Sequence, residues 1–60
     1  MRQDLLYFLM SLEDEHVISS LMNNMNREDL STLFHYLSYA SPESLERWQS
    51  VYEKIMLHTF

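Results

Sequence analysis

The sequence predicts an all-α protein, folded as a compact bundle of four short helices that forms a dimer. The chain of 60 residues contains no glycine and one proline, so few positions oblige a helix to stop. Helix-start signals recur at equal intervals, at Ser11, Asn26 and Ser41. Between these signals, apolar residues follow the 3.6-residue period of amphipathic helices. The four helices are expected at about residues 3–11, 12–23, 27–39 and 42–57.

The first helix, at about 3–11, carries an unbroken apolar run from Leu5 to Met10. A helix that is apolar all round has to be covered on every side, and three short neighbours can cover only part of it. We therefore expect it either to lie centrally in the fold or to bind another chain with its second face. The predicted interface consists of Leu5, Leu6, Phe8, Leu9 and Met10, with Asp4, Glu13 and Asp14 as its acidic rim.

A second helix is expected at about 12–23, because the apolar positions before residue 13 and after residue 16 project to opposite sides of a continuous helix. Ser11 is the predicted N-cap, and Glu13 and Asp14 in the first turn would face the positive end of the helix dipole. The helix should end within residues 23–26, because asparagine tolerates the left-handed conformation that glycine would otherwise supply.

The third helix, at about 27–39, follows Asn26 as its N-cap, and Pro42 suits the first position of the fourth, at about 42–57. The buried stripe of the third helix is predicted to be Leu30, Leu33, Phe34 and Leu37. That of the fourth is predicted to be Leu45, Trp48, Tyr52, Ile55 and Met56.

A chain of this length forms one domain, spanning residues 1–60, with a small core. Folding buries about 60% of its unfolded surface, and the apolar part of that burial contributes about 90 kcal/mol. Ordering the chain costs nearly the same, at about 1.5 kcal/mol per residue. The isolated subunit is therefore expected to be marginal, which favours a partner.

Composition also restricts the location of the protein. The absence of cysteine excludes disulfides and thiolate metal sites and fits a reducing compartment. The apolar run at 5–10 is far shorter than the roughly 20 residues of a membrane span and has no small-residue cleavage site behind it. We expect a cytoplasmic protein.

Charge argues against direct binding to nucleic acid. The formal net charge is −5, and the four basic residues Arg2, Arg27, Arg47 and Lys54 are widely spaced along the chain. Phosphate backbones require clustered cations, so the acidic balance instead favours a basic or apolar protein partner.

Enzyme chemistry has no support in the sequence. Nucleophilic catalysis and phosphate binding both rely on glycine-containing turns, which the chain lacks. Glu13 and His16 could share a helix face, but two ligands do not make a metal site. We expect no catalytic, cofactor-binding or metal-binding residues.

Helices at 12–23 and 27–39, joined by an asparagine-rich turn, have the spacing of a helix-turn-helix. A recognition helix there would present Arg27, Glu28, Ser31, Thr32 and His35 to DNA. Its acids would face phosphate oxygens, and one arginine does not offset them. A dimeric DNA-binding regulator is therefore the alternative prediction.

Residues 3–6, 17–24 and 52–55 loosely resemble the Hha/YmoA group of small helical modulators. The resemblance implies a helical protein that acts by binding a nucleoid-associated protein. Residues 40–43, Ala-Ser-Pro-Glu, stand where that group has an Asp-His-Arg segment, and no binding residue is transferred.

Together these features predict a small acidic regulatory module of a bacterium, phage or plasmid that acts by binding protein. It would be an adaptor or an inhibitor, with a nucleic-acid-binding protein as one candidate target. Its expected partner is a second copy of itself, a basic regulatory protein, or both.

Overall fold

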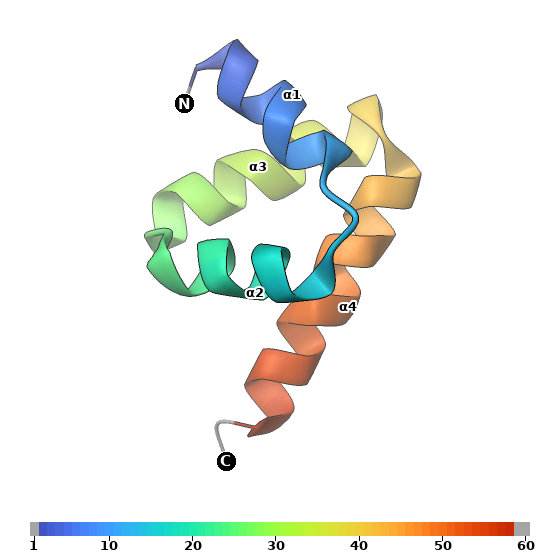
Figure 1. Ribbon diagram of the computed structural model, residues 1–60. Coiled ribbons are helices and arrows are strands. Elements are labelled where there is room, and N and C mark those ends of the chain that lie inside the picture. The colour runs from blue at the N-terminus through green and yellow to red at the C-terminus, as the bar shows by residue number, and fades with distance from the viewer. Residues whose placement is uncertain (1, 59–60) are drawn as a thin grey trace.

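A computed structural model describes residues 2–58, and these residues form four α-helices in a compact bundle (Figure 1). The helices are α1 (Gln3–Ser11), α2 (Glu15–Asn24), α3 (Arg27–Ala40) and α4 (Pro42–His58). The bundle measures 33 × 21 × 17 Å. The predicted all-helical fold is therefore confirmed, with the bounds of three helices within one residue of the prediction.

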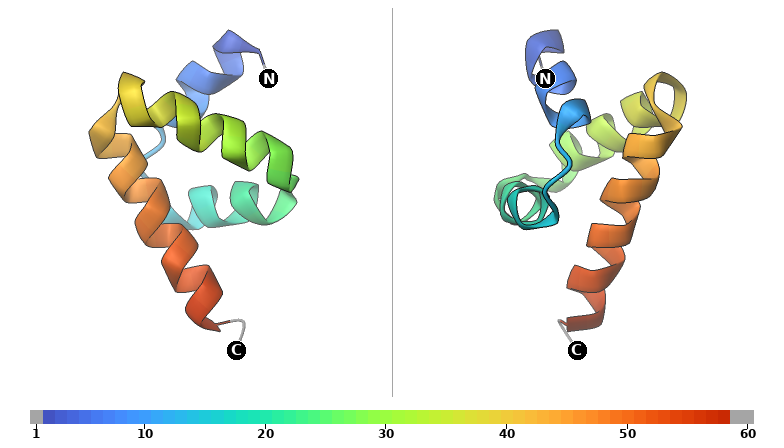
Figure 2. Two further views of the ribbon diagram at one scale, coloured as in Figure 1. Left: turned by 180° about the vertical axis from the view of Figure 1, so that it is seen from behind. Right: turned by 45° about the vertical axis from the view of Figure 1, so that its right-hand side comes forward.

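Helix α4 organises the bundle, because both α2 and α3 pack against it. Helix α1 packs on α3, on the side remote from the C-terminal end of α4 (Figure 1). Figure 2 shows from two further sides that the last turns of α4 project past the other three helices. The longest helix thus has a packed N-terminal part and a projecting C-terminal part.

The core draws on all four helices. Ile18, Leu33 and Trp48 are fully buried and occupy the equivalent position in each of the three equal intervals of the sequence. The remaining buried apolar residues are Leu6, Leu9, Met22, Leu37 and Val51. A core of this size is small even for a short chain, so each of these residues contributes substantially to stability.

The starts of α3 and α4 follow the predicted capping pattern. The Asn26 side chain accepts a hydrogen bond from the Asp29 amide at 2.7 Å, and the Ser41 hydroxyl accepts one from the Ser44 amide at 3.3 Å. Each bond satisfies an amide that has no partner within its own helix. Pro42 is the first residue of α4, as predicted.

The predicted N-cap of α2 was wrong. Ser11 is the last residue of α1, and its hydroxyl donates to the Phe8 carbonyl at 2.8 Å. Asp14 is the cap instead, accepting from the amides of His16 at 2.8 Å and Val17 at 3.4 Å. Because the Ser11 hydroxyl is used within α1 and Asp14 accepts from the first amides of α2, this helix begins at Glu15 rather than at residue 12.

The predicted left-handed end of α2 was also wrong, since no described residue has a positive φ. The chain leaves the helix through Met25 in an extended conformation, with φ −88° and ψ 143°. The Asn24 side chain donates to the Ser20 carbonyl at 2.8 Å. The Met25 amide donates to the Met22 carbonyl at 3.3 Å, which satisfies one of the carbonyls that a left-handed cap would have satisfied.

The predicted buried stripe of α4 was wrong in part. Val51 is buried, whereas Tyr52 and Met56 are exposed. The helical period of apolar residues continues to the end of α4, but α2 and α3 run across α4 and leave its last turns uncovered (Figure 2). Tyr52 keeps one contact with α3, an edge-to-face pair with Phe34 at 6.0 Å between ring centroids.

Three side chains of α4 hold the C-terminal end of α1. Its last carbonyls have no partner within the helix, and side chains 34 to 39 residues later donate to carbonyls at this end. We call this set the tertiary cap. It comprises the bonds from Ser44 Oγ to the Met10 carbonyl (2.7 Å), from Arg47 Nη1 to the Leu12 carbonyl (3.0 Å) and from Trp48 Nε1 to the Leu9 carbonyl (3.3 Å).

Ser44→Ala should lower the free energy of unfolding by about 1–2 kcal/mol, because it leaves the part-buried Met10 carbonyl without its donor. Urea unfolding followed by circular dichroism measures this change. Ser50→Ala is the matched control, since Ser50 lies exposed on the same helix and its replacement should change stability by less than about 0.5 kcal/mol. Equal stability of the two variants would contradict the role of the tertiary cap.

Candidate protein-binding surface

Helix α1 is covered on one side only. Leu6 and Leu9, 9% and 3% exposed, turn into the core, whereas Leu5 is 44% and Phe8 54% exposed. Leu5 and Phe8 are three residues apart and Asp4 is four before Phe8, so the three side chains adjoin on the outer surface of the helix. We call Asp4, Leu5 and Phe8 the α1 face.

The structure divides the predicted interface residues into two groups. Leu6 and Leu9 belong to the core, and Met10 is partly buried against it, so these side chains attach α1 to its own subunit. Leu5 and Phe8 remain accessible to a partner. The sequence could not separate the groups, because an apolar run that surrounds the helix does not show which side faces inward. Tyr7 is a further exposed aromatic residue of α1 outside the predicted set.

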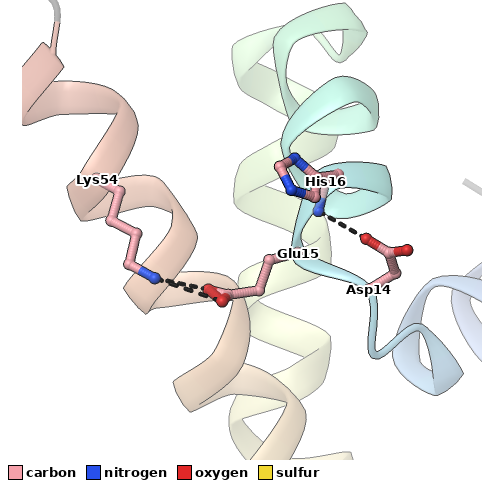
Figure 3. Close-up of polar contacts among 4 residues, drawn as sticks. All are labelled: Asp14, Glu15, His16 and Lys54. Atoms are coloured by element: carbon pink, nitrogen blue, oxygen red, sulfur yellow. Dashed lines mark hydrogen bonds and ion pairs between the residues drawn. The ribbon is translucent and has the colours of Figure 1, made fainter.

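The acids of the predicted rim lie along α1 and the segment that follows it. Asp4, Glu13 and Asp14 are all exposed. Figure 3 shows that Asp14 caps α2 and that the next acid, Glu15, reaches Lys54 of α4, with 2.8 Å between Nζ and Oε1. Both side chains of this ion pair are more than half exposed, so its contribution to stability is below about 1 kcal/mol.

The surface carries a large excess of negative charge. Lys54 and Glu15 form the only ion pair within residues 2–58, which leaves eight of the nine carboxylates without one. The Arg47 side chain donates to the Leu12 carbonyl. The other two arginines, Arg2 and Arg27, have no side-chain hydrogen bond within residues 2–58. A surface of this kind attracts a basic partner and repels phosphates.

The residues of the alternative recognition helix are exposed on α3, as a DNA contact would require. The basic residues are not gathered beside them, however. Arg47 is held at the end of α1 and Lys54 at the start of α2. Arg27 is therefore left with two acidic neighbours in the first turn of α3, Glu28 and Asp29. Binding of DNA through α3 stays a prediction without further support.

A second apolar surface was missed by the sequence analysis. Tyr52, Met56 and Leu57 are exposed on the projecting part of α4, and we call these residues the α4 end. Beside it, an open groove of about 650 Å³ runs between α3 and α4, lined by Leu30, Phe34 and Tyr52 among others. The apolar residues themselves were visible in the sequence, but their helical period is the same for the packed and the projecting part of α4.

Two further features were searched for in the described part of the chain. No group of three or more histidine or acidic residues there is arranged to hold a metal ion, and His16 lies exposed at the start of α2. None of the four helices combines the length and the apolar character needed to cross a bilayer.

No protein-family model, curated protein or solved structure matches this chain. The loose resemblance to the Hha/YmoA group therefore gains no support from a family match. The function has to be inferred from the surfaces of the molecule itself.

Leu5→Asp should lower stability by less than about 1 kcal/mol, because its side chain is already half in water. Leu6→Asp should abolish cooperative unfolding, since it places a carboxylate in the small core. Thermal unfolding followed by circular dichroism compares the two variants. Similar losses from both would show that α1 does not bury the side described above.

Proposed function

We propose that the protein is a small acidic regulatory module that binds another protein through the α1 face. The observation that carries this proposal is the division of α1, whose inner side is fixed in the core while Leu5 and Phe8 stay exposed beside Asp4. An aromatic and an aliphatic side chain on a helix held at its C-terminal end form a preorganised docking surface.

The chemistry of the face indicates the partner. An apolar centre next to Asp4, with Glu13 and Asp14 on the following segment, fits an apolar pocket bordered by lysine or arginine. Proteins that bind nucleic acids carry such basic surfaces. A cytoplasmic inhibitor of this class would occupy the partner's basic surface and compete there with phosphates.

The proposal is tested by affinity capture from the host lysate with immobilised wild type and Phe8→Asp. We expect a basic protein that wild type retains and Phe8→Asp loses. With the purified partner, Phe8→Asp should weaken binding at least about tenfold, a loss of about 1.4 kcal/mol, because it places a charge in the apolar centre.

Two controls make the result specific. Ser50→Asp adds the same charge at an exposed position on α4 and should leave binding unchanged. Asp4→Lys should weaken binding in low salt more than in high salt, because the rim acts through screened charge. Equal binding by wild type and Phe8→Asp would refute a role for the α1 face.

The helix-turn-helix alternative is tested separately with a mixed-sequence DNA duplex, by fluorescence anisotropy in about 50 and 200 mM salt. We expect no binding under either condition, given the unpaired carboxylates of the surface. Tight binding that falls steeply with salt and is lost in Arg27→Ala, but is kept in Phe8→Asp, would replace our proposal with the alternative.

A further inference from the structure

The α4 end and the groove beside it form one apolar surface that the subunit leaves open. Leu57 is 75% exposed, and Tyr52 and Met56 lie beside it on the same part of α4. Tyr52 also lines the groove with Phe34 and Leu30 of α3, so the exposed end of the helix and the groove are continuous.

The charges along this groove are of both signs. Arg27 of α3 and Glu53 of α4 line it, and neither belongs to an ion pair within residues 2–58. Lys54, which follows Glu53, is already paired with Glu15 of α2. The groove therefore offers one free cation and one free anion, in contrast to the uniformly acidic rim of the α1 face.

This charge pattern is self-complementary. In a two-fold dimer, each contact between a residue of one copy and a second residue of the other occurs twice. Arg27 of each subunit would then face Glu53 of the other, so two ion pairs would form from four charges that lack ion-pair partners in the separate subunits. An acidic partner would meet Glu53 and a basic one would meet Arg27, so neither fits the groove as well as a second copy does.

We propose that the protein forms a two-fold homodimer in which the α4 end of each subunit lies in the α3–α4 groove of its partner. Leu57 and Met56 enter the partner's groove, and Arg27 pairs across the interface with Glu53. The α1 face is not part of the proposed contact, because the groove and the α4 end lie on α3 and α4. The dimer is thus independent of the proposed docking function and leaves the α1 face free.

Sedimentation velocity across a dilution series of the full chain tests the dimer. The contact rests on a few apolar side chains and one charged pair from each subunit, so we expect dissociation in the micromolar range. A mass of one subunit at every concentration up to about 1 mM would overturn the proposal.

Variants of the α4 end and the groove test its geometry. Leu57→Asp should raise the dissociation constant at least about tenfold while the helical circular dichroism spectrum is kept, because Leu57 is exposed in the subunit. Arg27→Glu and Glu53→Arg should each weaken the dimer, and the double variant should restore it to within a few fold. Arg27→Glu places an acid in the first turn of α3, where the helix dipole favours it, so the fold is preserved.

Three results would refute this arrangement. They are an unchanged dimer in Leu57→Asp, no recovery in the double variant, and dissociation of the dimer by Leu5→Asp, which would assign the contact to α1. Capture of the protein partner distinguishes failure of the dimer from failure of the proposed function. Leu57→Asp should still bind the protein partner, whereas Phe8→Asp should lose that binding while remaining dimeric.

Discussion

The carbonyls at the end of α1 are the constraint on which the arrangement of the subunit depends. Helix α1 has no basic residue in its last turn. The Leu12 amide donates to the Leu9 carbonyl, and Ser44, Arg47 and Trp48 of α4 supply further donors at this end. The same bonds attach the end of α1 to α4, and burial of Leu6 and Leu9 in the core leaves Leu5 and Phe8 facing outward. The proposed docking surface is thus the side of α1 that stays open once this helix is attached to its own subunit.

A chain of 60 residues cannot cover all of its apolar surface, and the α1 face and the α4 end are two regions that stay open within residues 2–58. They differ in charge rather than in apolar character. The α1 face stands beside carboxylates without ion pairs, whereas the α4 end adjoins a groove with one arginine and one glutamate. In our proposals this difference directs the first region to a basic protein and the second to another copy of the chain.

The number of helices and most of their limits followed from local signals, namely the side chain of Asn26, the fixed φ of Pro42 and the helical period of leucines. The start of α2 did not, because Ser11 and Asp14 compete as caps, and the outcome depends on which carbonyls and amides lie within reach. The exposed side of α1 was also beyond local signals, since it depends on how α1 packs against the core formed by the later helices. Tyr52 and Met56 were assigned to the core because periodicity does not reveal where neighbouring helices end.

The distance along the sequence between α1 and its tertiary cap has a consequence for synthesis on the ribosome. The bonds from Ser44 and Trp48 span 34 and 39 residues, so α1 is made long before the residues that hold it. At about 5–20 residues per second, the end of the first helix waits roughly 2–8 seconds for these donors. The first helix therefore receives its full set of hydrogen bonds only when the chain is nearly complete.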